Sequence, residues 1–377
     1  MKKKIPLFKT YWDKEDVDSV SSTIESGMNW ATGPNVQEFE RQIAEYADTE
    51  YALVFSSGTS ALHAALLAHG IGKSDEVIVP SFTFISTANS ALFVGAKPVF
   101  ADIEEETFGL EPDDVEEEIT KKTKAIVPVH YGGCSCRIKE LTEIAEDHGL
   151  LLIEDAAESL GATVDGKKIG SFGDSAMFSF CANKILSTGE GGAIVTDTKD
   201  VYERLKLIRS HGRLESEDYF ASAKQMDYVS LGYNFRLSNI LATLGVSQMK
   251  KVEKVIAMRR KNATLMSKEL AKTSGLRTPI EPRGYRHVYQ LYTILLENKR
   301  LRDELMKHLV SCGIGCKVYF SPIHLTKFYK EEFGHRTGEL PNTEDLSQRV
   351  LTLPMHPMLK DEEIRYITDE IKSFLSE

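Results

Sequence analysis

The sequence predicts an α/β fold: a mostly parallel central sheet flanked by helices, followed by a smaller C-terminal α/β domain. Between Tyr51 and Asp197, short apolar runs alternate with amphipathic stretches, which is the pattern of repeated β-α-β units. From about Asn239 this alternation gives way to a long helical stretch rich in Lys, Met and Leu. The chain has 377 residues, 42% of them apolar, which is enough for a sizeable core and a second domain.

The first two hundred residues supply most of the predicted elements. Residues 1–11 show no periodic pattern and predict an N-terminal arm. Asn35 followed by Glu38 is typical of a capping box, which predicts a helix start. Segments between the apolar runs are helical in pattern, as at Arg137–His148. The predicted strands are Tyr51–Phe55, Glu76–Pro80, Lys97–Ile103, Ala125–His130, Leu150–Ala156, Ser175–Phe180 and Gly192–Asp197.

The remaining residues predict fewer and longer elements. One helical stretch is expected to run from about Asn239 to about Lys272. It is followed by a predicted strand at Gln290–Leu296 and helices near Leu301–Cys312 and Asp361–Leu375. We therefore expect an arm at residues 1–11, a large domain at 12–250 and a small domain at 251–377.

The charge balance excludes some classes of partner. A formal net charge of −10 argues against nucleic acid and anionic membranes as main partners. The basic N-terminus lacks the apolar stretch of a signal peptide, so a cytoplasmic location is expected. The uncharged segment Val77–Ala96 contains Pro80 and several polar residues. It predicts a buried strand, a loop and a helix start rather than a membrane span.

The cysteines do not predict a disulfide framework or a metal site. Their odd number, five, and the lack of a secretory signal suggest reduced thiols. Cys134 with Cys136, and Cys312 with Cys316, are spaced C-x-C and C-x-x-x-C. Zinc sites more often pair two C-x-x-C units, so no metal site is expected.

A candidate phosphate site follows the first predicted strand. The stretch Ser56–Leu62 (SSGTSAL) leads into a predicted helix at Ser60–Ala68. Backbone N–H groups and hydroxyls at a helix N-terminus can bind a phosphate. Ser and Thr are also common helix caps, so an ordinary N-cap remains an alternative for this stretch alone.

Two charged residues stand in apolar surroundings. Asp155 lies at the carboxyl end of a very apolar strand, where open α/β sheets bind ligands. Lys184 follows 29 residues later, and a half-buried lysine that loses its proton can form a Schiff base. Taken singly, Asp155 could cap the next helix, and Lys184 could keep its charge at the surface.

The three features together predict one cofactor. Pyridoxal 5′-phosphate (PLP) has a phosphate, a pyridine nitrogen and an aldehyde. It requires an anion-binding site, a carboxylate at the ring nitrogen and an amine for the aldehyde. The Ser56–Leu62 stretch, Asp155 and Lys184 supply these groups in that order along an α/β chain.

Motifs along almost the whole chain resemble the DegT-like family of nucleotide-sugar aminotransferases. The resemblance implies the fold type I of PLP-dependent transferases, with PLP bound by the large domain. Several motifs in one order and spacing are far more specific than any single one. The motifs are SSGTSAL, VPSFTFISTAN, AKPVFADI, IEDAAES, FSFCANKILSTGEGG, GYNFRLSN and SPIHL, within roughly Ile5–Leu375.

The resemblance implies roles for the residues around the cofactor ring. Lys184 would bond to the cofactor's aldehyde and move a proton once the substrate's amino group displaces it. Asp155 would keep the ring nitrogen protonated, and Phe84 would stack on the ring. Glu158 would lie near the ring hydroxyl, although many relatives carry Gln or His at this position.

The resemblance also implies a phosphate site that two subunits share. Gly58, Thr59 and Ser179 would bind the phosphate within one subunit. Asn234 would reach the phosphate of the neighbouring subunit's cofactor, which requires a homodimer with shared active sites.

The implied reaction is a ping-pong transamination. An amino acid, expected to be glutamate, donates nitrogen to a nucleotide-linked keto sugar, expected to be a 4-keto-6-deoxyhexose. Trp30, Thr32, Arg236 and His324 are the expected substrate-binding residues, although His324 could equally be a packed histidine beside a proline turn.

Several alternative functions remain open at this stage. They are amination of a 3-keto sugar, amination of an aminocyclitol precursor, and a non-catalytic regulatory protein that binds PLP. Some relatives dehydrate the sugar and carry His at the lysine position, and Lys184 argues against that reaction here.

Overall fold

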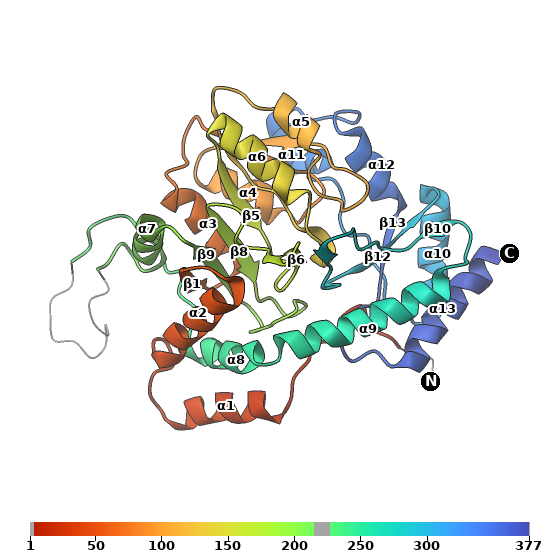
Figure 1. Ribbon diagram of the computed structural model, residues 1–377, viewed down its shortest axis with the longest axis horizontal. Helices are drawn as coiled ribbons and strands as arrows, with labels where there is room; N and C mark the ends of the chain where they lie inside the picture. Colours follow the sequence, from red (N-terminus) through yellow and green to blue (C-terminus); the bar gives the residue numbers. More distant parts are fainter. Residues whose placement is uncertain (1–3, 215–226, 377) are drawn as a thin grey trace.

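The computed structural model describes residues 4–214 and 227–376, and its centre is a seven-stranded sheet (Figure 1). The strand order is β1-β9-β8-β5-β4-β2-β3. β9 pairs antiparallel with β1 and β8, whereas the other neighbouring pairs are parallel. The strands are β1 (Tyr51–Phe55), β2 (Glu76–Pro80), β3 (Lys97–Ala101), β4 (Thr123–Ile126), β5 (Leu151–Asp155), β8 (Ser175–Ser179) and β9 (Gly192–Thr196).

Helices cover both faces of this sheet. The side chains of β1 alternate: Ala52 and Val54 join one core with α2, α5, α6 and α8, while Leu53 and Phe55 join another with α3, α4 and α7. The helices of this part are α1 (Lys14–Glu25), α2 (Pro34–Ala47), α3 (Gly58–Ala68), α4 (Ser86–Phe93), α5 (Pro112–Glu117), α6 (Ile138–His148), α7 (Lys199–Arg209) and α8 (Asn239–Met249), with the short η1 (Tyr131–Gly133).

The C-terminal part has its own core around the antiparallel sheet β10-β12-β13. Ile5 of the N-terminal arm is buried in this core, and its N–H donates to the Gly313 carbonyl at 2.9 Å. Residues 1–3 of the predicted arm lie outside the described residues. The elements are β10 (Leu276–Arg277), β12 (Tyr292–Leu296), β13 (Val350–Leu353), α9 (Val252–Leu270), α10 (Lys299–Ser311), α11 (Lys327–Phe333), α12 (Pro341–Arg349), α13 (Asp361–Ser376) and η2 (Ile323–Leu325).

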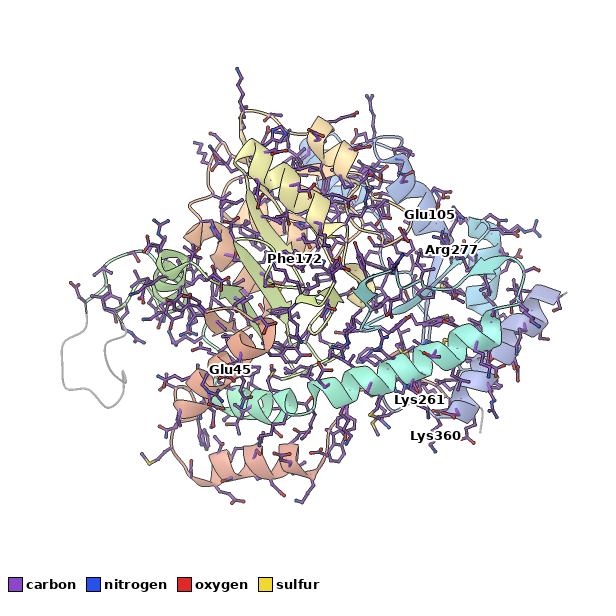
Figure 2. The ribbon with its side chains drawn as sticks, viewed as in Figure 1. Glu45, Glu105, Phe172, Lys261, Arg277 and Lys360 are labelled. Carbon is purple, nitrogen blue, oxygen red and sulfur yellow. The ribbon has the colours of Figure 1, made fainter. Side chains whose placement is uncertain are left out.

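An ion pair and a small shared sheet connect the part built on the central sheet to the C-terminal part. Arg277 of β10 forms an ion pair of 3.1 Å with Glu105, which follows β3, and the two residues lie side by side in Figure 2. A small sheet is also shared, because β11 (Tyr285–Arg286) pairs with β6 (Thr163–Val164), which pairs with β7 (Lys167–Lys168). The predicted domain boundary, 250/251, falls in the turn between α8 and α9 and stays a prediction.

Two local predictions were wrong. The stretch from Asn239 is two helices, because the chain turns at Lys250 and Lys251, and Lys251 is held by Asp13 and Asp16 at 2.6 and 2.8 Å. Asn35 does not cap a helix: α2 begins at Pro34, and the Asn35 side-chain Nδ2 donates instead to the Thr243 hydroxyl of α8 at 2.8 Å.

The uncharged segment Val77–Ala96 folds as expected. It forms β2, a loop and α4, with most of its residues buried. In the described ranges, no helix is both long and apolar enough to cross a membrane.

Candidate active site

The predicted site residues Asp155, Ser179 and Lys184 lie at the carboxyl ends of two neighbouring strands. Asp155 ends β5, Ser179 ends β8, and Lys184 lies in the loop between β8 and β9. Because β5 and β8 are parallel partners, their carboxyl ends meet at one edge of the sheet. This edge is where open α/β sheets bind their ligands.

Lys184 is held by a loop that is fixed from several directions. Its own N–H donates to the Cys181 carbonyl at 2.9 Å, which closes a tight turn. Thr10 of the arm donates to the Ala182 carbonyl at 2.6 Å, and Gln290 of the C-terminal part donates to the Asn183 carbonyl at 2.7 Å. The arm and the C-terminal part therefore both position the lysine.

The Lys184 side chain points inward and meets a carboxylate. It is 14% exposed, and its Nζ lies 3.2 Å from Oε1 of Glu158, which is itself buried. The other Glu158 oxygen accepts the Gly132 N–H at 2.8 Å. Lys184 is thus not a surface lysine, and Glu158 is bound on both of its oxygens.

Asp155 is a buried carboxylate that is 3% exposed. Its Oδ2 accepts the Thr87 hydroxyl at 2.7 Å, and its Oδ1 accepts the Ala157 N–H at 3.2 Å. Burial raises the pKa of Asp155, although Thr87, Ala157 and the positive charge of Lys184 act in the opposite direction. A cationic group beside this carboxylate would therefore stabilise its charged form.

The start of α3 forms a narrow cup next to Ser179. Ser57 caps the helix in a reciprocal capping box with Ser60, and the N–H groups of Gly58 and Thr59 lie in the first turn, where no helical partner exists. A Cβ on Gly58 would lie 3.1 Å from Met177 Sδ and 3.2 Å from Ser179 Cβ. Glycine therefore keeps this cup open, and anions are favoured there.

Phe84 lies one turn before Thr87, the residue that binds Asp155. Its ring is 58% exposed, although it belongs to the otherwise buried loop between β2 and α4. An exposed aromatic ring beside a polar site is available to cover a bound planar group.

The expected substrate residues do not gather around Lys184 within one chain. Thr32 and Arg236 line an open cavity of about 780 Å³, to which Lys184 and Asp155 do not contribute, and Trp30 is 49% exposed. Asn234 is exposed, and the neighbouring Phe235 carbonyl accepts the Ser56 N–H at 2.7 Å. The segment around Asn234 therefore borders the SSGTSAL stretch.

The structure favours the packed alternative for His324. The side chain is fully buried, Nδ1 lies 2.8 Å from the Ser81 hydroxyl, and Nε2 lies 3.2 Å from Glu344. Burial lowers the pKa of His324 despite the nearby Glu344 carboxylate. With both ring nitrogens engaged, His324 has none to offer to a substrate in this structure.

Buried residues behind the site support it: His130, expected from the sequence to be structural or near the cofactor, and Glu154, which the sequence reasoning missed. His130 and Glu154 form a fully buried pair at 3.0 Å, and Glu154 also accepts the N–H groups of Gly170, Phe172 and Gly173. Although burial opposes its charge, His130 and these N–H groups hold the pKa of Glu154 below its ordinary value. Glu154 is the neighbour of Asp155 in IEDAAES, and this charged residue inside an apolar strand was the available signal.

Comparisons with known proteins identify the family of this chain. The model of the DegT/DnrJ/EryC1/StrS aminotransferase family matches residues 10–372. GDP-perosamine synthase of Escherichia coli O157:H7 is 35% identical over 375 residues, which cover 100% of both chains.

Solved structures share the fold over nearly the full length. PseC of Helicobacter pylori, an aminotransferase of pseudoaminic acid biosynthesis, aligns with a TM-score of 0.92 and 30% identity, covering 99% of this chain and 100% of PseC. The PLP form of Spr1654 from Streptococcus pneumoniae aligns with a TM-score of 0.93 and 27% identity over 99% of each chain. The chain therefore belongs to the DegT/DnrJ/EryC1/StrS aminotransferase family, and the enzyme class expected from its sequence is confirmed.

Proposed function

We propose that this aminotransferase binds PLP between Asp155, Lys184 and the start of α3. The observation that carries the proposal is Lys184 itself: an almost buried amine, next to Glu158, at the strand ends that also present a buried carboxylate. The residues fit the cofactor. Gly58 keeps open a cup that a Cβ would fill. Burial raises the pKa of the Asp155 carboxyl, so a cationic ring nitrogen beside it would favour its charged form.

Each residue of the site has a distinct part in the reaction. When bound, PLP supplies an aldehyde for amines and a ring that withdraws electrons from the substrate carbon. Asp155, as a carboxylate, holds a proton on the ring nitrogen by charge pairing. Lys184, released as an amine once the substrate's amino group displaces it, would move a proton between the substrate carbon and C4′ of the cofactor.

Further residues orient the cofactor and limit access. Gly58 and Thr59 offer backbone N–H groups, and Ser179 a hydroxyl, to the phosphate. Phe84 covers one face of the ring and excludes water from it. Glu158 holds the Lys184 amine in place. Its other oxygen accepts the Gly132 N–H, which connects Lys184 to η1, the short helix that follows β4.

We further infer a donor and an acceptor. The amino group comes from glutamate and passes to a nucleotide-linked keto sugar, a 4-keto-6-deoxyhexose, in two half-reactions. Support for a nucleotide-linked sugar comes from the relative named GDP-perosamine synthase. Amination at C3 and amination of a cyclitol remain alternatives, and no contact among the described residues favours either one.

The substrate test is a mass-spectrometric screen. The enzyme, loaded with PLP, is incubated with glutamate and a panel of UDP-, GDP- and dTDP-linked 4-keto-6-deoxy sugars and their 3-keto isomers. We expect one nucleotide to give an aminated product and 2-oxoglutarate in equal amounts. Turnover of a 3-keto sugar alone would contradict the C4 assignment, and failure of every nucleotide sugar would contradict the acceptor class.

We also propose a homodimer with shared sites. Asn234 is exposed in the single chain, and the residues preceding it carry exposed apolar side chains, with Leu231 81% exposed and Tyr228 58%. Such side chains are expected where a partner covers them. A sedimentation measurement is expected to give twice the chain mass of 42.2 kDa; an active monomer would contradict the shared site.

A further inference from the structure

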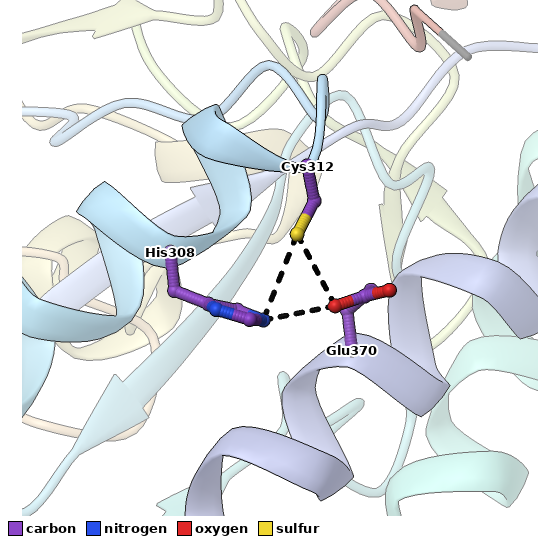
Figure 3. Close-up of side chains that lie close together, drawn as sticks. All are labelled: His308, Cys312 and Glu370. Carbon is purple, nitrogen blue, oxygen red and sulfur yellow. Dashed lines mark hydrogen bonds and ion pairs between the residues drawn. The ribbon is translucent and has the colours of Figure 1, made fainter. Parts of the chain in front are cut away.

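Three metal-ligating side chains converge on the C-terminal part, away from the strand ends of the central sheet. His308 and Cys312 lie four residues apart at the end of α10, so they share one face of that helix. Glu370 faces them from α13 (Figure 3). α10 and α13 carry none of the residues assigned to the PLP site.

The ligand atoms are spaced as in a coordination sphere. Cys312 Sγ lies 3.2 Å from Glu370 Oε2 and 3.8 Å from His308 Nε2, and the remaining edge of the triangle, Nε2 to Oε2, is 2.9 Å. A tetrahedral zinc ion with sulfur, nitrogen and oxygen ligands holds them about 3.4–3.6 Å apart, from its usual bond lengths. Shifts of about half an ångström would therefore accommodate an ion.

The surroundings fix the triangle in place and leave it reachable. The His308 ring packs on Phe374 with centroids 5.3 Å apart, which sets its orientation. Tyr366 of α13 donates to the Cys312 carbonyl at 3.2 Å and so ties the end of α10 to α13. The His308 and Glu370 side chains are 30% and 26% exposed, so an ion can enter from solvent.

We propose that His308, Cys312 and Glu370 bind a divalent transition-metal ion of the zinc class, with water as the fourth ligand. A thiolate with an imidazole favours such ions over magnesium or calcium. On binding, the Cys312 S–H bond breaks as the sulfur–metal bond forms, and the proton leaves to solvent, as does any imidazolium proton. The oxidation state of the metal and the protein is unchanged.

The ion would clamp α10 to α13. Both helices pack on the core that also buries Ile5 of the arm, so the clamp acts on the part of the molecule that helps position the Lys184 loop. The cysteine spacing predicted no metal site, because that prediction considered only pairs of cysteines. It missed this group because Glu370 is distant in sequence and His308 is not part of a cysteine motif.

The test measures metal content directly. PLP-loaded enzyme without an affinity tag is reduced, stripped with a chelator and dialysed against micromolar Zn²⁺ or Co²⁺. We expect one ion per chain, and Co²⁺ is expected to show the visible bands of a thiolate-bound tetrahedral site. Zn²⁺ is expected to raise the melting temperature of the wild type.

Matched variants separate this site from incidental binding. Cys312→Ser and Glu370→Gln are expected to lose the stoichiometric ion, with affinity falling by more than the roughly 10–100-fold typical of outer-shell changes. Cys316→Ser is the control, because burial raises the pKa of this nearby thiol to about 11 and its Sγ contacts the Met306 carbonyl instead. Folding of each variant is checked by circular dichroism.

Two results would overturn the proposal: less than one ion per chain in the folded wild type, or retention of the ion at the wild-type level by the Cys312→Ser and Glu370→Gln variants. A variant with normal transamination but no bound ion is still consistent with it, because the site is separate from the PLP site.

Discussion

At the scale of single residues, the site combines charges that are costly to bury. Asp155 is 3% exposed and Glu158 is 6% exposed, yet Lys184 contacts only Glu158 directly. A cationic ring nitrogen bound beside Asp155 would stabilise its buried negative charge. Function at this site is therefore expected to cost stability in the apo-protein.

Asp155→Asn is expected to make the apo-protein more stable and the enzyme less active. Because burial raises the pKa of Asp155, the native state binds this proton more tightly than the unfolded chain does. The resulting stabilisation is present below the ordinary value of 3.8 and is lost as pH rises through the raised pKa. At neutral pH the variant apo-protein should therefore resist urea better than the wild type, while transamination falls on the order of 10²–10³-fold.

The pH dependence supplies the control for Asp155→Asn. The stability advantage of the variant should shrink as the pH falls toward 4 and should vanish when PLP is bound to the wild type. An apo-variant that is less stable than the wild type at pH 7 would contradict this account of Asp155.

Glu158 is expected to hold the site together through its two contacts. Glu158→Ala leaves the buried Gly132 N–H without its partner, which costs about 1–3 kcal/mol in the free energy of unfolding. Glu158→Gln keeps an oxygen for that N–H and should cost less. Urea unfolding of both apo-variants tests this, and equal losses would show that the Gly132 contact contributes nothing.

At the scale of elements, the site depends on how closely the start of α3 approaches β9. A Cβ on Gly192 would lie 2.7 Å from both the Gly58 nitrogen and the Ser57 carbonyl oxygen, which are backbone atoms that cannot rotate away. The stretch STGEGG, Ser187–Gly192, thus ends in a glycine required by packing. The need for glycine at position 192 was not visible from the sequence, because the backbone that it contacts, at Ser57 and Gly58, is distant along the chain.

Gly192→Ala is expected to displace the phosphate cup. Overpacking of this kind typically costs about 1–3 kcal/mol, and the displaced N–H groups should weaken PLP affinity as well. Gly72→Ala is the control, since its added Cβ would meet only the Val94 carbonyl at 3.8 Å. Thermal unfolding and PLP titration measure both effects, and a Gly192→Ala protein with normal PLP affinity would contradict the proposed cup.

The strands of the central sheet were predictable for a physical reason. They are buried on both faces, so they appear in the sequence as continuous apolar runs, such as Tyr51–Phe55 and Glu76–Pro80. The two-residue strands β6, β7 and β11 were not predicted, because so short a segment has no period. The strand predicted at Ala125–His130 was misplaced. In the structure β4 is Thr123–Ile126, and the chain then bends so that His130 reaches Glu154.

At the scale of the whole molecule, distant segments complete the site. The arm and the C-terminal part both bind the Lys184 loop, through Thr10 and Gln290. The resemblance of motifs identified Lys184, Asp155 and Ser179 at one edge of the sheet. The contacts of Thr87, Gly132 and His130 could not be predicted, because they depend on strand order and loop paths.

Mixed dimers test whether Asn234 acts on the partner's cofactor. Lys184→Ala and Asn234→Ala, each inactive alone, are unfolded and refolded together in equal amounts. In a mixed dimer one site then carries both changes and the other carries neither. Because random pairing makes about half of the dimers mixed, roughly one quarter of the wild-type activity should return. If Asn234 acted within its own chain, no site would be intact and no activity would return.

The central claim, that Lys184 is the catalytic amine, is tested most directly by spectroscopy of the PLP-loaded enzyme. The wild type should absorb near the edge of the visible range, and glutamate should bleach that band. Lys184→Ala should lack the lysine-dependent band, and its turnover should fall by at least the roughly 10²–10⁴-fold that a positioned acid–base group contributes. Wild-type turnover by the Lys184→Ala variant would contradict the account.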